Sequence, residues 1–163
     1  MARLERSTGD LSAAVFETAD EKGTRALGES FGRSVPRGTV VSLEGGLGAG
    51  KTCFVKGVAR GLGIDAEVLS PTFILVEEYR GEIPFFHFDL YRLEKLEEVE
   101  KIGFYDAIDG RNIVMVEWGD RLPGGEDIFD VRVRIEITSG SQRKIEIEGP
   151  SGLLDRMWGT PVE

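Results

Sequence analysis

The sequence predicts an α/β fold in which a central sheet is flanked by helices and followed by a C-terminal antiparallel β-hairpin. Three observations support this prediction. A glycine-rich loop at residues 45–52 stands between an apolar strand-like run and a helix-compatible run. A second apolar run, at residues 112–117, ends in an acid. Near the C-terminus, residues 129–138 and 143–148 alternate apolar and polar side chains, which is the pattern of two half-buried strands.

Length and composition are those of a single globular domain, which we expect to span residues 1–163. Of these 163 residues, 40% are hydrophobic and 30% are charged, as in ordinary globular proteins. No apolar run approaches the roughly 20 residues of a membrane span, and the N-terminus lacks the apolar core of a signal peptide. The single cysteine, Cys53, excludes an internal disulfide and a cysteine-based zinc site. These observations predict a cytoplasmic protein with no membrane partner.

The acidic charge balance limits the partners that the chain can hold by itself. The net charge of −9 comes from 29 acidic and 20 basic side chains. Such a balance argues against a broad electrostatic contact between this chain alone and nucleic acid. If RNA is involved, we expect a partner to hold it.

A strand and a helix are predicted near the N-terminus. The short apolar run within residues 11–18 predicts the strand. Thr18 and Glu21 have the spacing of a capping box, so we expect the helix to begin near Ala19 and to end at the turn over residues 36–38. The side chains expected on its inward face are Ala26, Leu27, Ser30 and Phe31.

The glycine-rich loop, from Gly45 to Thr52, has the G-x-x-x-x-G-K-[ST] pattern of a phosphate-binding P-loop. Glycines let successive backbone N–H groups form an anion-binding nest, and the helix that follows adds the positive end of its dipole. We expect Lys51 to reach the β- and γ-phosphates of a nucleotide and the Thr52 hydroxyl to bind Mg²⁺. The phosphate-binding residues predicted from this pattern are Leu47, Gly48, Ala49, Gly50, Lys51 and Thr52. The sheet is therefore expected to be P-loop NTPase-like.

A turn at Ser70-Pro71-Thr72 leads into an apolar run that continues to Val76 and predicts a strand. Pro71 biases Ser70 toward extended geometry. Ser70 and Thr72 are ordinary turn formers, but their distance from the loop also resembles that of a nucleotide-sensing switch segment. Both interpretations remain open.

Residues 83–91 predict a buried strand in which His87 and Asp89 share one face. Burying such a polar pair without hydrogen-bond partners costs several kcal/mol, so the presence of the pair in an apolar strand needs an explanation. One explanation is a satisfied hydrogen bond in the core or an exposed strand end. The other is that Asp89 points at bound phosphates or their water. The strand alone does not decide between them.

The run at residues 112–120 has four apolar residues before Glu117, which is the pattern of a Walker B strand. In such strands the acid lies beside the phosphate loop and binds Mg²⁺ directly or through water. The alternative is an ordinary core strand that ends in an exposed glutamate. Because a P-loop precedes it, we favour a metal-site acid.

The remaining elements carry less information about function. Residues 93–101 predict an acidic amphipathic helix with Leu93, Leu96 and Val99 facing inward. The C-terminal hairpin has one apolar and one charged face, so we expect it at a sheet edge with water on one side. A short helix is expected over residues 151–158.

Four motifs together resemble one known family. In chain order they are Leu47-Gly48-Ala49-Gly50-Lys51-Thr52, Ser70-Pro71-Thr72-Phe73, His87-Phe88-Asp89-Leu90-Tyr91-Arg92 and Val116-Glu117-Trp118. Their order and spacing are similar to those of the TsaE family (formerly YjeE) of bacterial P-loop ATPases. The loop is shared by a vast superfamily, whereas the His-Phe-Asp-Leu-Tyr-Arg and Glu-Trp motifs are far more specific.

The resemblance implies a small ATPase that binds ATP or ADP with Mg²⁺ and hydrolyses ATP slowly by itself. It implies action with homologues of the TsaD transferase and its partner TsaB, in which nucleotide turnover resets the complex between rounds of threonylcarbamoyladenosine formation on tRNA. The tRNA is then an indirect partner, reached through the complex.

The resemblance also implies roles for single residues. Thr52 and Glu117 would hold Mg²⁺, Lys51 and the loop N–H groups would hold the phosphates, and Asp89 would be required for hydrolysis. Glu21 and Gly140 would lie near the adenine.

Two loop residues depart from the pattern of the family, which usually has an acid at the position of Gly46 and a threonine or serine at that of Cys53. Position 46 is variable in the general loop pattern, so we expect phosphate binding to survive. Cys53 lacks a hydroxyl for a second phosphate contact. A thiol beside a helix N-terminus is also expected to have a lowered pKa.

Three other functions are compatible with a P-loop. A small-molecule kinase would need an acceptor pocket and an arginine-bearing lid; Arg111 or Arg121 could serve, but no arginine-rich lid segment is evident. A GTPase would need a guanine-reading N-K-x-D motif, which the chain lacks. A non-catalytic nucleotide sensor that docks on a partner is the third.

Overall fold

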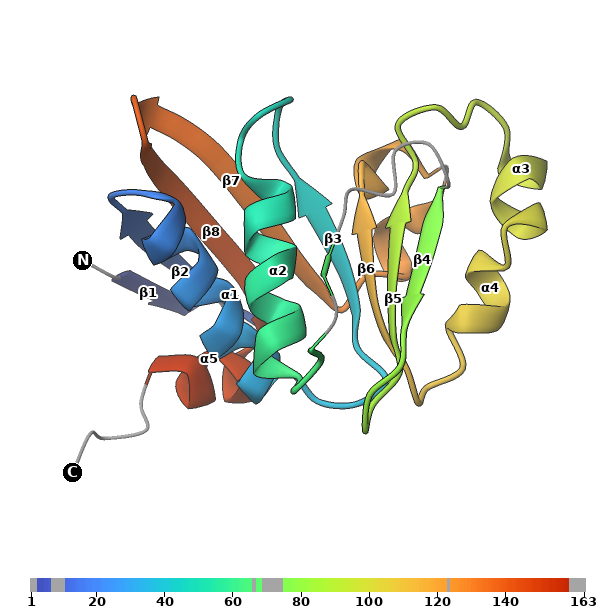
Figure 1. Ribbon diagram of the computed structural model, residues 1–163, viewed down its shortest axis with the longest axis horizontal. Coiled ribbons are helices and arrows are strands. Elements are labelled where there is room, and N and C mark those ends of the chain that lie inside the picture. The colour runs from blue at the N-terminus through green and yellow to red at the C-terminus, as the bar shows by residue number, and fades with distance from the viewer. Residues whose placement is uncertain (1–2, 7–10, 66, 69–74, 123, 159–163) are drawn as a thin grey trace.

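The computed structural model describes residues 3–6, 11–65, 67–68, 75–122 and 124–158. An eight-stranded mixed sheet crosses the molecule in the order β1-β2-β8-β7-β3-β6-β5-β4, with helices on both faces (Figure 1). The expected α/β architecture, with a central sheet, flanking helices and a C-terminal hairpin, is confirmed.

The element bounds are as follows. The strands are β1 (Arg3–Arg6), β2 (Leu11–Thr18), β3 (Val40–Glu44), β4 (Val76–Tyr79), β5 (Phe85–Asp89), β6 (Ile113–Glu117), β7 (Val131–Ser139) and β8 (Gln142–Pro150). The α-helices are α1 (Glu21–Ser34), α2 (Lys51–Gly61), α3 (Leu96–Lys101), α4 (Phe104–Ala107) and α5 (Ser151–Trp158). Two 3₁₀ turns are η1 (Gly119–Arg121) and η2 (Gly125–Asp127).

The strand that leads into the P-loop lies in the middle of the sheet. β3 pairs in parallel with β6 on one side and with β7 on the other, and β5 pairs in parallel with β6. The carboxyl ends of these parallel strands therefore meet at one edge of the sheet. Such an edge is where ligands bind in α/β proteins.

The C-terminal hairpin does not form a sheet edge, so that expectation is wrong. β7 hydrogen-bonds with β3, while β8 pairs with β2, and β1 closes that side of the described sheet. The charged face of the hairpin is solvent-facing as expected, but both of its outer edges have partners. The short segment that forms β1 has no strand periodicity in the sequence, which is why it was not predicted.

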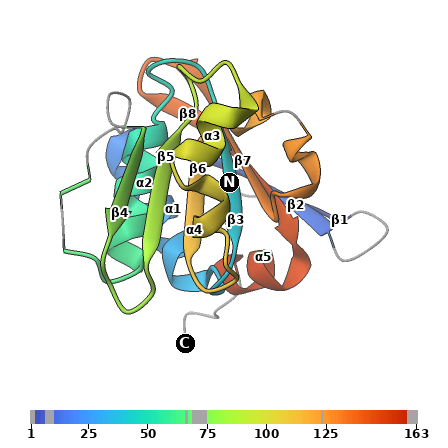
Figure 2. The same ribbon diagram turned by 90° about the vertical axis from the view of Figure 1, so that its right-hand side faces the viewer.

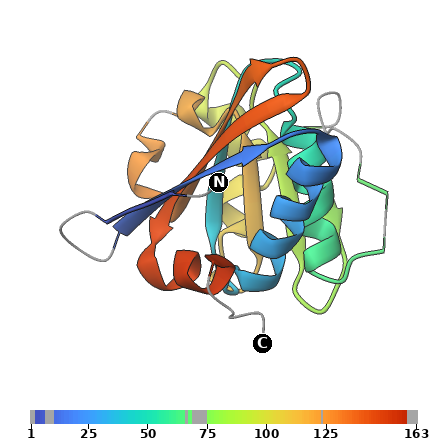
Figure 3. The ribbon, with the colours of Figure 1, turned by 90° about the vertical axis from the view of Figure 1, so that its left-hand side faces the viewer.

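Helices cover the two faces of the sheet unequally. On one face, α1, α2 and α5 bury a core that includes Phe31, Phe54 and Leu43. On the other face, α3 and α4 lie over the β5–β6 half of the sheet (Figure 2). Phe88 and Phe104 are buried there. Viewed from the opposite side, β1 and β2 lie nearest the viewer, with α5 below them (Figure 3).

Two helix starts differ from the sequence prediction. α1 begins at Glu21, and its N-cap is Asp20, whose carboxylate accepts a hydrogen bond from Gly23 N–H at 2.9 Å. Thr18, the last residue of β2, lies two residues before this N-cap, and its hydroxyl bonds to that of Thr24. α3 is shorter than expected: Val99 is buried, but Leu96, its first residue, is 41% exposed.

α1 and α2 pack with their backbones in direct contact. The face that α1 buries consists of Thr24, Gly28, Phe31 and Gly32, whereas Ala26 is exposed, so the expected stripe was partly wrong. A Cβ added at Gly28 or Gly32 would collide with the backbone carbonyls of Phe54 and Val58 in α2. The contact at Gly28 is to Phe54 and the contact at Gly32 is to Val58, so the two helices run in the same direction, side by side (Figure 1). Their N-terminal ends therefore lie together, beside the P-loop.

This contact predicts the effect of a small substitution. A Cβ at Gly57 would collide with the Arg25 carbonyl oxygen, which belongs to a helix backbone and cannot rotate away. Gly57→Ala is therefore expected to lower the free energy of unfolding by about 1–3 kcal/mol, although helix propensity alone favours alanine by about 1 kcal/mol. Chemical denaturation measures the difference.

Gly152→Ala in α5 is the matched control. The nearest atom to a Cβ there is Arg156 Nη1, at 3.7 Å, so we expect no loss of stability. If Gly57→Ala proves as stable as Gly152→Ala, the close packing of α1 on α2 is contradicted.

Candidate functional site

A cavity of about 390 Å³ opens at the carboxyl ends of the central strands. Its walls bring together the P-loop, the start of α1, and the ends of β5 and β6. The lining residues are Glu21, Arg25, Leu47, Gly48, Ala49, Gly50, Lys51, Thr52, Cys53, Lys56, Asp89, Glu117 and Trp118. All of the site residues proposed from the sequence are among them except Gly140, whose turn lies beside the loop and is described below.

The loop adopts a conformation that depends on its glycines. Gly45, Gly48 and Gly50 have φ angles of 156°, 75° and 109°, values that side-chain-bearing residues rarely adopt. Gly50 is the N-cap of α2 and contributes no side-chain hydrogen bond, so the first N–H groups of the helix remain available to a ligand. A Cβ at position 46 would meet no atom within 4 Å, so a side-chain-bearing residue can begin there without a clash.

Lys51 lines the cavity and is 7% exposed. Its Nζ donates a hydrogen bond to the Gly45 carbonyl at 2.6 Å and lies 4.0 Å from the centre of the Trp118 ring. Burial lowers the pKa of this ammonium below its ordinary value, while the negative charges of Glu117 and Asp89 oppose that shift. The cavity thus holds a cation beside two acids.

Asp89 and Glu117 end neighbouring strands and are directly opposite each other in the β5–β6 register. Both line the cavity, at 4% and 3% exposure, so the alternatives of an exposed strand end for Asp89 and an exposed glutamate at 117 are excluded. Asp89 Oδ1 accepts a hydrogen bond from Tyr91 N–H at 2.9 Å, which fixes the carboxylate beside the chain that follows β5.

His87 is fully buried behind these acids. Its Nε2 lies 3.3 Å from Glu117 Oε2, although neither ring nitrogen makes a well-aligned hydrogen bond within the described part of the chain. The sequence predicted that His87 and Asp89 share a face, but it did not show that the histidine would contact the acid of the adjacent strand. The imidazole restricts where the Glu117 carboxylate can lie.

Trp118 forms a wall of the cavity that the sequence analysis did not assign. Its φ of 61° is unusual for a non-glycine residue and turns the ring back over Lys51. The ring centre lies 5.0 Å from that of Tyr91, and Arg121 lies over both rings and donates to the Tyr91 carbonyl. The only sequence signal for this wall was the position of Trp118 directly after Glu117.

The oxygen donors in the cavity fit a magnesium ion better than a softer metal. The Thr52 hydroxyl and the carboxylates of Glu117 and Asp89 are all hard ligands. Within the described residues there is no cluster of three or more acids, histidines or cysteines that would hold a metal by itself. This composition suits Mg²⁺, which keeps several waters and is usually bound by one or two protein groups together with substrate phosphates.

Cys53 does not have the lowered pKa expected from its place near a helix N-terminus. Its thiol donates to the Glu21 carbonyl at 3.2 Å, between α1 and α2. Burial raises the pKa of this thiol. The positive charge of Arg25 lowers the pKa in part, and the negative charge of Glu21 raises it further. The burial of the sulfur by helix packing therefore affects the pKa more than the positive N-terminal end of α2 does.

The raised pKa predicts slow alkylation of Cys53. Iodoacetamide reacts with the thiolate, so the folded protein is expected to react more slowly at pH 7.5 than the urea-unfolded chain. As pH rises, the folded protein is expected to reach half of its maximal rate at a higher pH than the unfolded chain. Mass spectrometry of timed reactions measures both rates, and a faster folded-state reaction at pH 7.5 would contradict the assignment.

A glycine loop between a central parallel strand and a helix, beside two buried acids at neighbouring strand ends, defines a protein of the P-loop class. The sequence model of a family described as "Threonylcarbamoyl adenosine biosynthesis protein TsaE" matches residues 18–146. The chain belongs to the TsaE family, which acts in tRNA threonylcarbamoyladenosine biosynthesis.

Several relatives carry that name. The Treponema pallidum protein is 40% identical over 124 residues, covering 76% of this chain and 92% of its own length. The Bacillus subtilis protein is 37% identical over 133 residues, covering 81% and 82%. Among solved structures, Bacillus subtilis YdiB superposes with a TM-score of 0.72 at 26% identity, covering 92% of this chain and 97% of YdiB. The family resemblance and the fold class predicted from the sequence are confirmed.

Two further expectations concern the rest of the chain. The suggested switch at Ser70-Pro71-Thr72 lies outside the described residues. No helix in the described part of the chain combines the length and apolar character needed to cross a membrane.

Proposed function

We propose that this chain binds ATP in the cavity and hydrolyses it to ADP and phosphate in support of threonylcarbamoyladenosine formation on tRNA. One observation carries the proposal: Lys51, Asp89 and Glu117 converge on one cavity from the P-loop and two neighbouring strands. Burial of charge is costly. A glycine-rich turn that bound no phosphate would therefore not be expected to lie beside two buried acids and a buried lysine.

The loop and Lys51 would bind the nucleotide phosphates. The backbone N–H groups from Leu47 to Thr52 supply directional donors, and Lys51 moves from the Gly45 carbonyl to the phosphate oxygens. A bound Mg²⁺, held by the Thr52 hydroxyl and Glu117, would offset the phosphate charge. His87 keeps the Glu117 carboxylate in place, since their nearest atoms lie 3.3 Å apart.

Asp89 is the group we assign to hydrolysis. It lies opposite Glu117 in the sheet and lines the same cavity, so it can orient or deprotonate a water beside the terminal phosphate. We propose that the adenine of the nucleotide lies at the side of the cavity formed by the start of α1 and the adjacent hairpin turn. Glu21 is at the start of α1, and Gly140 is in the turn.

The reaction would serve a complex. We propose that homologues of TsaB and TsaD stimulate the slow hydrolysis of this chain, and that turnover resets the complex between rounds of tRNA modification in the cytoplasm. The net charge of −9 supports indirect contact with tRNA, through these partners.

Phosphate release tests this proposal. It is measured with the chain alone, with TsaB and TsaD homologues, and with tRNA added. We expect a low rate alone and a several-fold higher rate with the partners. Binding of ATP without phosphate release in any mixture would contradict the ATPase and favour a nucleotide sensor. Stoichiometric phosphorylation of a small molecule would instead favour a kinase.

A further inference from the structure

The turn between β7 and β8 is tied to the P-loop by one side chain. Arg143, the second residue of β8, donates from Nε to the Ala49 carbonyl at 2.8 Å. The Nη1 of the same guanidinium donates to the carbonyls of Gly140 and Gln142, at 2.8 Å and 3.0 Å. One planar group therefore joins the hairpin turn to the loop across 94 residues of sequence.

Two more contacts place the hairpin against the site, one from its turn and one from β7. The Ser141 hydroxyl donates to the Ala19 carbonyl, just before α1, at 2.8 Å. A Cβ at Gly45 would lie 2.7 Å from the Ile135 carbonyl oxygen, so the first loop residue lies directly on the backbone of β7. Figure 1 shows the hairpin turn and the loop between β3 and α2 at the same, upper end of the molecule.

The contact to Ala49 has a consequence for anion binding. A loop that aims its N–H groups at a phosphate must turn carbonyls away from it, and those carbonyls need donors of their own. Ala49 is 3% exposed, so water has little access to this peptide. Arg143 supplies the donor. It also places a positive charge beside the loop, with no carboxylate within ion-pair distance in the described part of the chain.

We propose that Arg143 is a positioning residue that holds the P-loop in its phosphate-binding shape before a nucleotide arrives. The guanidinium fork fixes the Ala49 peptide and the hairpin turn relative to each other, whereas a lysine ammonium has three donors but no rigid planar geometry. This inference rests on the proposed nucleotide binding for its function, but the loop order that it predicts exists without any ligand.

Three variants test the proposal. Arg143→Met removes the fork, and Arg143→Lys keeps the charge without the fork. Arg156→Met is the matched control, because Arg156 Nε donates to another backbone carbonyl, that of Ser34 at the far end of α1. Each variant is titrated with ADP by calorimetry, and the exchange of the backbone amides at residues 46–51 is measured without nucleotide by hydrogen exchange.

Arg143→Met is expected to weaken ADP binding about tenfold and to speed amide exchange in the loop by a similar factor, because charged-donor hydrogen bonds have this strength. Arg143→Lys is expected to bind ADP several-fold more weakly than the wild type. Arg156→Met is expected to bind ADP with wild-type affinity. Recovery of full affinity and loop protection by Arg143→Lys would show that charge alone matters and would overturn the positioning role, as would wild-type loop exchange in Arg143→Met.

The two proposals fail in distinguishable ways. If the wild-type chain binds no ADP, the proposed function fails, while amide exchange in the ligand-free loop still decides the role of Arg143. If the wild type binds ADP and both Arg143 variants bind it equally well, the positioning role fails and the proposed function stands.

Discussion

Lys51→Ala is expected to abolish nucleotide binding, raising the Kd for ADP by about a hundredfold or more. Lys51 is a buried cation in a cavity with two buried acids, so its loss leaves the negative charges of Asp89 and Glu117 uncompensated beside a phosphate. Charge-assisted hydrogen bonds contribute about 1.5–3 kcal/mol each, and this repulsion adds to the loss. Calorimetric titration with ADP, in the presence and absence of Mg²⁺, measures the change.

Lys101→Ala is the control for this prediction. Lys101 is the exposed last residue of α3 and lies outside the cavity, so its removal changes net charge by the same amount without touching the site. Thermal unfolding of both variants tests whether the fold is retained. ADP binding by a folded Lys51→Ala chain at wild-type affinity is incompatible with phosphate binding at this loop.

Asp89→Asn is expected to separate binding from hydrolysis. Asparagine keeps the carbonyl oxygen that accepts the Tyr91 N–H bond, so the end of β5 should be preserved. It removes the negative charge and the basic oxygen that orient or deprotonate water. We expect ATP affinity within about threefold of the wild type and partner-stimulated hydrolysis lower by about a hundredfold or more, the usual size of a general-base contribution.

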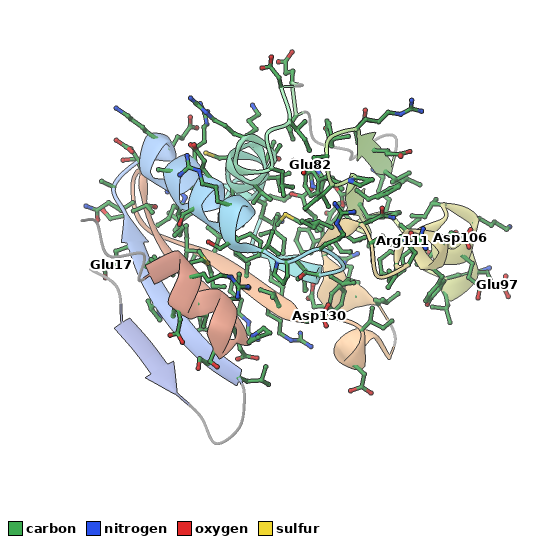
Figure 4. All side chains as sticks on the ribbon, turned by 90° about the horizontal axis from the view of Figure 1, so that it is seen from below. Glu17, Glu82, Glu97, Asp106, Arg111 and Asp130 are labelled. Carbon is green, nitrogen blue, oxygen red and sulfur yellow. The ribbon has the colours of Figure 1, made fainter. Side chains whose placement is uncertain are left out.

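Asp106→Asn serves as the matched control, because Asp106 is an exposed residue of α4 that does not line the cavity. Figure 4 shows Asp106 at one side of the molecule. Hydrolysis by this control should equal that of the wild type. Equal hydrolysis rates for Asp89→Asn and Asp106→Asn would remove Asp89 from the reaction and favour a sensor that only binds nucleotide.

The parts of the site that the sequence predicted are those encoded by local patterns. The P-loop spacing follows from backbone conformation, since both of its fixed glycines, Gly45 and Gly50, have positive φ angles. The strands ending in Asp89 and Glu117 were visible as apolar runs followed by an acid, and parallel pairing brings their ends together. The burial of both acids excluded the exposed alternatives, while their roles toward a nucleotide stay predictions.

The parts that were missed depend on contacts between distant segments. Arg143 occupies a charged position in an alternating strand, and its pattern cannot reveal a carbonyl of the P-loop as its partner. Gly28 and Gly57 weaken the apparent helix signal, although they allow the backbone contact that brings two helix N-termini together. Cys53 was assigned a lowered pKa from its helix position, but burial against α1 raises it.

Repeated tRNA modification tests the central claim, that nucleotide turnover in this cavity supports the complex. Threonylcarbamoyladenosine is counted per TsaB–TsaD complex over several rounds, with wild-type chain, Lys51→Ala or Asp89→Asn added. We predict continued modification with the wild type, and no more than about one round with either variant. Sustained, wild-type modification by a chain that has lost ATP hydrolysis would contradict the account.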